Sequence, residues 1–224
     1  MKNLEIYIHI PFCVRKCEYC DFLSFPADDD AKLRYVKGLM AEMIFYGPLM
    51  KNYQVSSVYI GGGTPSSIDE QWIAALMEGV FDCFNVLPDA EISIECNPGT
   101  LSREKLLAYR DAGINRLSIG LQSANNDELK LLGRIHTFEQ FVTNYEVARN
   151  VGFKNINVDL MYGLPGQSAS QYMATVNKII RLHPDHISAY SLIVEKGTPF
   201  YEKYKFDMVR QEAGMRTEFL PNED

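Results

Sequence analysis

Three cysteines near the N-terminus have the spacing of a ligand motif. Cys13, Cys17 and Cys20 follow a C-x3-C-x2-C pattern, with mostly charged residues in the gaps. Clustered thiolates bind soft metals, so metal or redox chemistry is expected. The spacing leaves three interpretations open: buried thiols on one helix face, a zinc site with His9 as fourth ligand, or an iron–sulfur cluster. We favour the cluster because the sequence lacks the second cysteine pair typical of zinc sites. Three thiolates would leave one iron of a cubane open to another ligand.

A run of three glycines, residues 61–63, precedes Thr64 and Pro65. Glycine has no Cβ, so a ligand can approach such a backbone closely. A tight turn between a strand and a helix explains a single glycine equally well. Three in succession favour a ligand-binding loop.

Polar side chains end three of the later predicted strands. They are Glu95, Gln122 and Asp159. If the strands are parallel, their carboxyl ends meet at one edge, where such groups can bind ribose hydroxyls and an amino group. Arg134 lies in a helix turn, where it is either a carboxylate partner or a solvated charge.

Strand-like and helix-like segments alternate along the chain, which predicts parallel βαβ units. Capping-box patterns predict helix starts at Ser67, Thr137 and Ser168. An open doubly wound sheet and a partial TIM-like barrel both fit this alternation, and either fold places function at the carboxyl ends of the strands. The predicted strands span residues 4–10, 57–60, 91–95, 116–121, 155–161 and 186–194.

The composition is that of a globular protein. The 224 residues are 46% hydrophobic and 23% charged, and 22 basic against 29 acidic residues give a net charge of −7. These values exclude a disordered chain, a collagen and a coiled coil, and no apolar run is long enough for a membrane span. The acidic charge disfavours general nucleic-acid binding. The lack of a signal sequence and the odd cysteine count predict a cytoplasmic protein. Cys83 and Cys96 have no recognisable motif spacing, so we expect them to be buried free thiols.

Together these residues resemble the radical S-adenosylmethionine (SAM) superfamily, through its cysteine motif and its glycine loop. More narrowly, residues 7–13, 61–65, 94–95, 116–122 and 159–165 resemble the oxygen-independent coproporphyrinogen III oxidase-like family, and the resemblance runs from residue 7 to residue 200. The oxidases usually carry a fourth cysteine two residues after the third. Asp21 and Phe22 follow Cys20 here, as in the HemW-type haem chaperone branch.

The resemblance implies an incomplete TIM-like (β/α)6 barrel of parallel strands with outer helices. It implies that Cys13, Cys17 and Cys20 hold a [4Fe-4S] cluster. It assigns no catalytic residue. The residues that it implies for SAM binding are Tyr7, Tyr19, Gly62, Gly63, Thr64, Glu95, Gln122, Arg134 and Asp159.

The function implied by the resemblance is delivery of haem to an acceptor protein, with haem as a further ligand. The alternative is oxidative decarboxylation of coproporphyrinogen III, as a coproporphyrinogen dehydrogenase-type oxidoreductase. The partners implied are haem or a porphyrin, the acceptor, an electron donor and a second copy in a homodimer. The acidic charge argues against a third class, the tRNA-modifying radical-SAM enzymes. We expect a core barrel over residues 1–200, and over residues 201–224 the start of a C-terminal region that is truncated.

Overall fold

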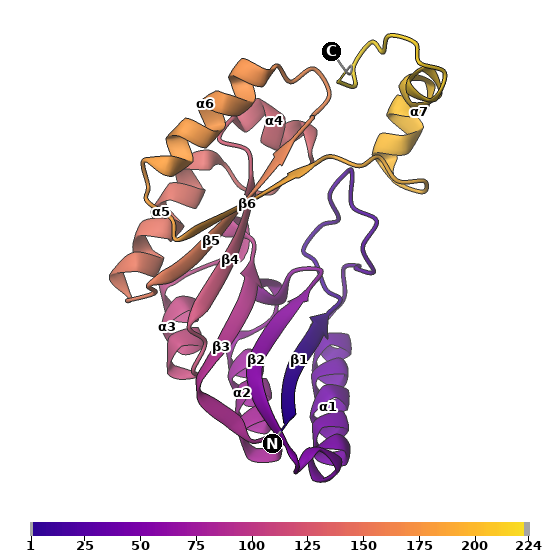
Figure 1. Ribbon diagram of the computed structural model, residues 1–224. Helices are drawn as coiled ribbons and strands as arrows, with labels where there is room; N and C mark the ends of the chain where they lie inside the picture. The colour runs from indigo at the N-terminus through magenta and orange to yellow at the C-terminus, as the bar shows by residue number, and fades with distance from the viewer. Residues whose placement is uncertain (1, 222–224) are drawn as a thin grey trace.

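The structure, a computed structural model, describes residues 2–221. Its centre is a six-stranded sheet in which every neighbouring pair is parallel and the strands lie in chain order. The sheet curls into a half-barrel, which confirms the partial barrel (Figure 1). Its strands are β1 (Lys2–Ile10), β2 (Tyr53–Gly62), β3 (Val86–Cys96), β4 (Arg116–Gln122), β5 (Asn155–Tyr162) and β6 (His186–Ser191).

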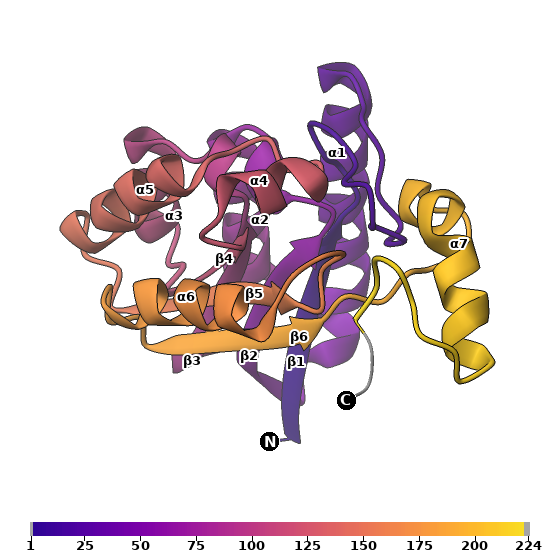
Figure 2. The same ribbon diagram turned by 90° about the horizontal axis from the view of Figure 1, so that it is seen from above.

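Helices α1–α3, α5 and α6 cover the convex face of the sheet, while α7 stands apart from them (Figures 1 and 2). None of the helices within the described part of the chain is long and apolar enough to cross a bilayer. The α-helices are α1 (Asp29–Tyr46), α2 (Glu70–Cys83), α3 (Arg103–Asp111), α4 (Asn126–Leu131), α5 (Phe138–Asn150), α6 (Ala169–Ile180) and α7 (Pro199–Glu212). Short 3-10 turns are η1 (Gly47–Met50), η2 (Pro65–Ser67) and η3 (Pro98–Thr100).

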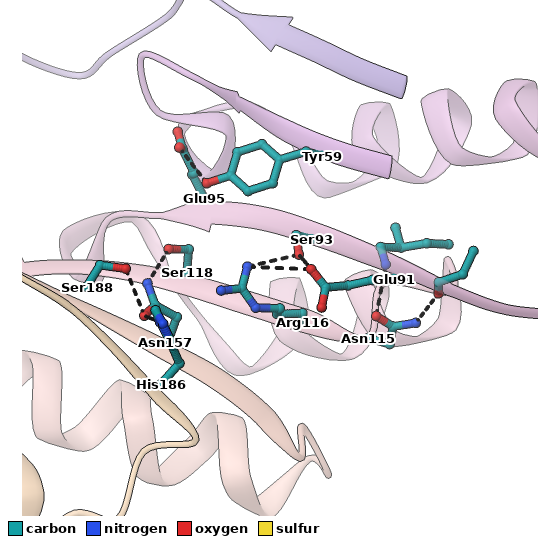
Figure 3. A network of polar contacts seen from close by, with 12 residues as sticks. Tyr59, Glu91, Ser93, Glu95, Asn115, Arg116, Ser118, Asn157, His186 and Ser188 are labelled. Carbon is teal, nitrogen blue, oxygen red and sulfur yellow. Dashed lines mark hydrogen bonds and ion pairs between the residues drawn. The ribbon is translucent and has the colours of Figure 1, made fainter. Parts of the chain in front are cut away.

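The two faces of the half-barrel differ in chemistry. Side chains such as Ile60, Ile94 and Val158 are fully buried against the outer helices. Alternate positions on the same strands carry polar groups, including Tyr59 and Glu95, on the inner face (Figure 3). Because side chains alternate along a strand, one face builds the hydrophobic core and the other is free to bind a polar ligand.

Several predicted element ends differ from the structure, and two predicted helix starts are confirmed. Strands β2 and β3 begin at Tyr53 and Val86, several residues before the predicted starts at 57 and 91. Helix α2 is capped by Asp69, because the Ser67 hydroxyl donates to the distant Phe12 carbonyl instead. The last strand ends at Ser191 rather than at residue 194. The capping boxes at Thr137 and Ser168 are both formed, each with a glutamine three residues later.

The end of the described chain packs on a second, smaller core. Phe200 and Tyr204 of α7 and Leu220 meet Leu132 and Leu164 there. This cluster lies near the carboxyl ends of the strands, so α7 borders the region where function is expected. The predicted division at residue 200 falls within α7, and the two-part organisation stays a prediction.

Asp207 holds the last segment against α7. Its buried carboxylate accepts the backbone N–H groups of Glu218, Phe219 and Leu220, at 2.6–3.0 Å. Burial alone would raise the pKa of Asp207, but these donors and Arg210 hold it below its ordinary value. A carboxylate with a lowered pKa stabilises the fold above its unfolded pKa of about 3.9, and that contribution is lost as the pH falls through the folded value.

Replacing Asp207 with asparagine is therefore expected to loosen the last segment. We expect a loss of about 1–3 kcal/mol in local stability at pH 7, because asparagine keeps only one of the two acceptor oxygens and loses the charge that the three N–H groups contact. Amide hydrogen exchange at residues 218–220 measures it, and the difference from wild type should shrink below about pH 3.9. Asp111→Asn, at an exposed position, is the control. Equal exchange in Asp207→Asn and wild type would contradict the assignment.

Candidate functional site

One cavity of about 320 Å³ lies at the carboxyl ends of the strands. Every residue that the resemblance implies for cluster or SAM binding lines it except Tyr7, whose ring stacks on Tyr59. The structure therefore brings together residues that are spread along the sequence from Cys13 to Asp159. The singled-out residues in the lining are Cys13, Cys17, Tyr19, Cys20, Gly62, Gly63, Thr64, Glu95, Gln122, Arg134 and Asp159.

The glycine loop is shaped so that side chains could not fit. Gly62 has φ of +122°, a conformation that favours glycine. A Cβ there would lie 2.8 Å from the His9 ring, and one on Gly63 would lie 2.8 Å from the Phe12 carbonyl oxygen and 3.0 Å from Cys13 Sγ. These distances are too short for real Cβ contacts, so the loop and the cysteine segment pack backbone against backbone.

The cysteine segment runs from β1 to α1 without regular structure and is tied down from two sides. Its Glu18 amide donates to the Leu132 carbonyl, and the Phe200 amide donates to the Glu18 carbonyl. The Arg15 guanidinium also donates to the Gly133 carbonyl, at 2.6 Å. Contacts with the end of α4 and the start of α7 thus fix the loop over the cavity.

The three cysteine sulfurs face the cavity but do not converge on one point. Within residues 2–221, no three His, Cys, Asp or Glu side chains are grouped to hold a single metal ion. The ring nitrogens of His9 contact Tyr7 Oη and the Leu23 carbonyl, rather than a cysteine sulfur. An iron–sulfur cluster needs no such convergence, because each thiolate binds a different iron. The [4Fe-4S] cluster stays a prediction at these three cysteines.

Arg134 links the cysteine segment to β4. Its Nη1 donates to Cys17 Sγ at 3.4 Å, and its Nη2 donates to the Gly120 carbonyl at 2.6 Å. Its Nε is buried and has no hydrogen-bond partner among the described residues. A buried unpaired donor is costly. The Arg134 guanidinium lines the cavity and forms no described salt bridge, so its charge favours an anionic ligand there. Arg134 is therefore no ordinary solvated charge.

Two carboxylates face the cavity from β3 and β5. Glu95 accepts hydrogen bonds from Tyr59 Oη at 2.8 Å and from the Gly62 amide at 3.0 Å. Asp159 accepts from the Ser118 hydroxyl at 3.2 Å and from Asn157 Nδ2 at 2.6 Å. Burial raises the pKa of Glu95, and the Asp159 charge adds to that effect. None of the described salt bridges involves either carboxylate, so the pair favours a cationic ligand.

Gln122 is held in an unusual backbone conformation at the end of β4. Its φ is +75°, and the register of β4 against β5 shifts between Gly120 and Gln122. Its side-chain oxygen accepts a hydrogen bond from Tyr190 Oη at 2.6 Å. Strained non-glycine residues gather at binding sites, and here the bulge turns an amide into the cavity.

Several lining residues were not singled out from the sequence. Ser118 lines the cavity and donates to Asp159, and Tyr190 lines it near the end of β6. Asn157 lies outside the lining, on the same inner face, where it donates to Ser118 (Figure 3) and to Asp159. The signal that could have found them is strand alternation: Asn157 lies two positions before Asp159, and Tyr190 lies at a strand end like Gln122. Counting back by two from each strand-end residue would have predicted this inner polar face.

The sequence is similar to a known protein family and to several curated proteins. A family model described as the radical SAM superfamily matches residues 7–179. The chain is 40% identical over 196 residues to the heme chaperone HemW of Bacillus subtilis (strain 168), covering 87% of this chain and 52% of that protein. It is 37% identical to the heme chaperone HemW of Escherichia coli (strain K12), covering 99% and 55%. The chain thus spans about half the length of the curated relatives it matches.

Solved structures agree with this fold. The chain superposes on the coproporphyrinogen III oxidase HemN of Escherichia coli, described as a radical SAM enzyme, with a TM-score of 0.81 and 28% identity. That match covers 100% of this chain and 56% of the other. The SuiB protein of Streptococcus suis, solved with S-adenosylmethionine bound, matches at a TM-score of 0.63 and 19% identity, which supports the fold alone.

Proposed function

The chain belongs to the radical SAM superfamily, and from that premise we propose that its cavity holds a [4Fe-4S] cluster and SAM. One observation carries the proposal: the residues implied by the sequence, far apart along the chain, line a single cavity. Cys13, Cys17 and Cys20 would hold three irons. The fourth iron would be left to SAM.

The residues present fit both groups. Three thiols supply the donor set of a cluster, and Thr64 Oγ1 lies 3.4 Å from Cys13 Sγ, so the glycine loop and the cysteines meet. The guanidinium of Arg134, which lines the cavity and forms no described salt bridge, suits the carboxylate of SAM. Glu95 and Asp159, which no described cation pairs, suit its positively charged end. The lining thus offers opposite charges to the two ends of a zwitterionic cofactor.

The chemistry that the two groups supply together when bound is one-electron reductive cleavage of a sulfonium carbon–sulfur bond. The contribution of the protein is to bind and orient these two groups. The glycine loop packs closely on the cysteine segment and donates the Gly62 amide to Glu95. Tyr19, which belongs to the cysteine segment, packs on Phe200 of α7. Burial raises the pKa of Tyr19 above its ordinary range, so its hydroxyl stays protonated and serves as a neutral hydrogen-bonding group.

We further propose that the protein delivers haem to an acceptor protein. The curated relatives named above carry that activity in their names, and Asp21 and Phe22 replace the cysteine usual in the oxidases. The cavity mouth supports it, because Phe22 and Ile193 line it and are 70% and 65% exposed. Exposed apolar side chains beside a pocket mark a surface for an apolar ligand such as a macrocycle. Haem, the acceptor and an electron donor are the partners proposed.

Haem titration tests this proposal. We expect the protein to shift the Soret band of added haem and then to pass the haem to an apo-acceptor. Phe22→Ser is expected to weaken haem binding by about tenfold, because an aromatic side chain contributes about 1.5–3 kcal/mol when buried. Phe45→Ser is the matched control, since Phe45 is 68% exposed at the far end of α1. Absence of a Soret shift in the wild-type protein, or equal weakening by both variants, would contradict the proposal.

A second candidate is oxidation of coproporphyrinogen III, favoured by the 0.81 TM-score to the HemN structure. Anaerobic incubation with SAM, a reductant and coproporphyrinogen III distinguishes the two. Formation of protoporphyrinogen would establish the oxidase. We expect none, because the fourth cysteine of the oxidases is replaced.

A further inference from the structure

Tyr59 lies two residues before the glycine loop, on the inner face of β2. The strand register pairs it with Ser93, two residues before Glu95 on β3. Its ring therefore leans along the strand toward the carboxyl end, and its hydroxyl reaches Glu95 Oε1 at 2.8 Å (Figure 3). Tyr59 is absent from the cavity lining, and its hydroxyl contacts the lining through Glu95.

The absence of a side chain at Gly61 makes this contact possible. A Cβ on Gly61 would lie 2.8 Å from the Tyr59 ring, 3.1 Å from Glu95 Oε2 and 3.1 Å from the Tyr7 ring. The Tyr7 ring also stacks on Tyr59, with centroids 6.2 Å apart and planes 22° from parallel. Tyr59 is thus packed on one side by Tyr7 and fixed at its tip by Glu95.

Both oxygens of Glu95 are held by neutral donors. Tyr59 donates to Oε1, and the Gly62 amide donates to Oε2 at 3.0 Å. Two donors from adjacent positions orient a carboxylate while leaving each oxygen a free lone pair for a ligand. We propose that Tyr59 is a positioning residue that keeps the Glu95 carboxylate oriented and ionised for a cationic ligand, which in the function proposed above is SAM.

The groups around Glu95 determine in which direction its pKa should change when the Tyr59 hydroxyl is lost. Burial raises its pKa, and so does Asp159 on β5, whereas Tyr59, the Gly62 amide and His9 on β1 lower it. Loss of the Tyr59 hydroxyl removes one of the groups that lower the pKa. As the pH is lowered, the Glu95 carboxylate should then be protonated earlier, at a higher pH than in wild type. The affinity for a cation should start to fall at that same higher pH.

The test is SAM binding by the cluster-loaded protein, measured by calorimetry across pH for wild type and Tyr59→Phe. We expect Tyr59→Phe to bind SAM about tenfold more weakly at neutral pH. A loss of this size corresponds to the lower end of the free energies measured for hydrogen bonds to charged groups. The pH at which affinity falls by half should move upward. Tyr53→Phe, at the opposite end of β2, should match wild type in both respects. Wild-type affinity and an unchanged midpoint in Tyr59→Phe would overturn the proposal.

A Glu95→Gln background separates positioning from general packing. Once the charge is gone, adding Tyr59→Phe should weaken SAM binding no further, because the two residues act through one carboxylate. Equal and additive losses would show that Tyr59 acts through packing and would overturn the assignment.

A readout on the cofactor-free chain keeps this inference distinct from the proposed function. Carboxyl-detected NMR titration should report a higher pKa for Glu95 in Tyr59→Phe than in wild type. If wild type bound no SAM, the proposed function would fail, while this titration would still decide whether Tyr59 keeps Glu95 ionised. An unchanged Glu95 pKa would overturn the inference even where SAM binds.

Discussion

Cys17→Ala is expected to purify anaerobically as a colourless protein whose iron content is at background, whereas wild type is brown. Each proposed ligand holds a different iron, so loss of one thiolate leaves a cluster with two protein ligands and an exposed edge. Cys17 is the most informative of the three, because Arg134 Nη1 donates to its sulfur at 3.4 Å. Iron and sulfide analysis, together with the absorption spectrum after reconstitution, measure the outcome.

Cys83→Ala and Cys96→Ala are the matched controls. Cys83 ends α2 on the outer side of the sheet, and the thiol of Cys96 is buried and contacts the Ile94 carbonyl. Burial raises the pKa of Cys96, so its thiol stays protonated and is a poor metal ligand. Both variants should keep the iron content of wild type. Normal iron in Cys17→Ala, or its loss in Cys83→Ala, would contradict the assignment of the cluster.

The pattern of the sequence predicted the strands well because each strand must satisfy a local rule. Every predicted strand is present, and the strand-end rule placed Glu95, Gln122 and Asp159 at one edge of the sheet. The hydrophobic periodicity of the sequence could not distinguish an open sheet from a half-barrel. A doubly wound sheet reverses its strand order at a switch point, whereas these strands lie in chain order. Strands and helices alternate along the chain in the same way in both folds.

The errors arose where a distant residue competes with a local pattern. Ser67 fits a capping box by sequence, but its hydroxyl donates to Phe12, fifty-five positions away, and Asp69 caps the helix instead. The contact between Arg134 and Cys17 joins residues 117 positions apart, so spacing could not reveal it. The positioning roles of Tyr59, Ser118 and Asn157 depend on strand register, which is set only when the sheet forms.

The register also explains why the inner face can carry so many polar groups. Parallel sheets usually bury both faces, and the strands then read as continuous apolar runs. Here the inner groups satisfy one another across neighbouring strands, as where Asn157 bonds Ser118 on β4 and Ser188 on β6 (Figure 3). Such satisfied polar groups need no apolar cover, and this leaves the inner face available to a ligand.

Gly62→Ala is expected to have the second large effect, a loss of SAM binding of more than about tenfold in the cluster-loaded protein. A side chain at φ of +122° is strained by about 1–3 kcal/mol. The new Cβ would also press on the His9 ring at 2.8 Å and on the Ile10 carbonyl oxygen at 2.9 Å. The loop must shift to relieve these contacts, and the Gly62 amide then leaves Glu95. Calorimetry with SAM measures the loss, and the Glu95 pKa should rise with it.

Gly38→Ala is the matched control for the same chemical change. Gly38 lies within α1, and a Cβ there would meet nothing within 4 Å. Alanine is the better helix former by about 1 kcal/mol, so this variant should bind SAM as wild type does and melt at a slightly higher temperature. Gly62→Ala should melt lower because its strain has no compensation. If Gly62→Ala bound SAM as tightly as Gly38→Ala, the role of the Gly62 backbone at the SAM site would be wrong, because the strain and the contacts with His9 and Ile10 would not have displaced the loop.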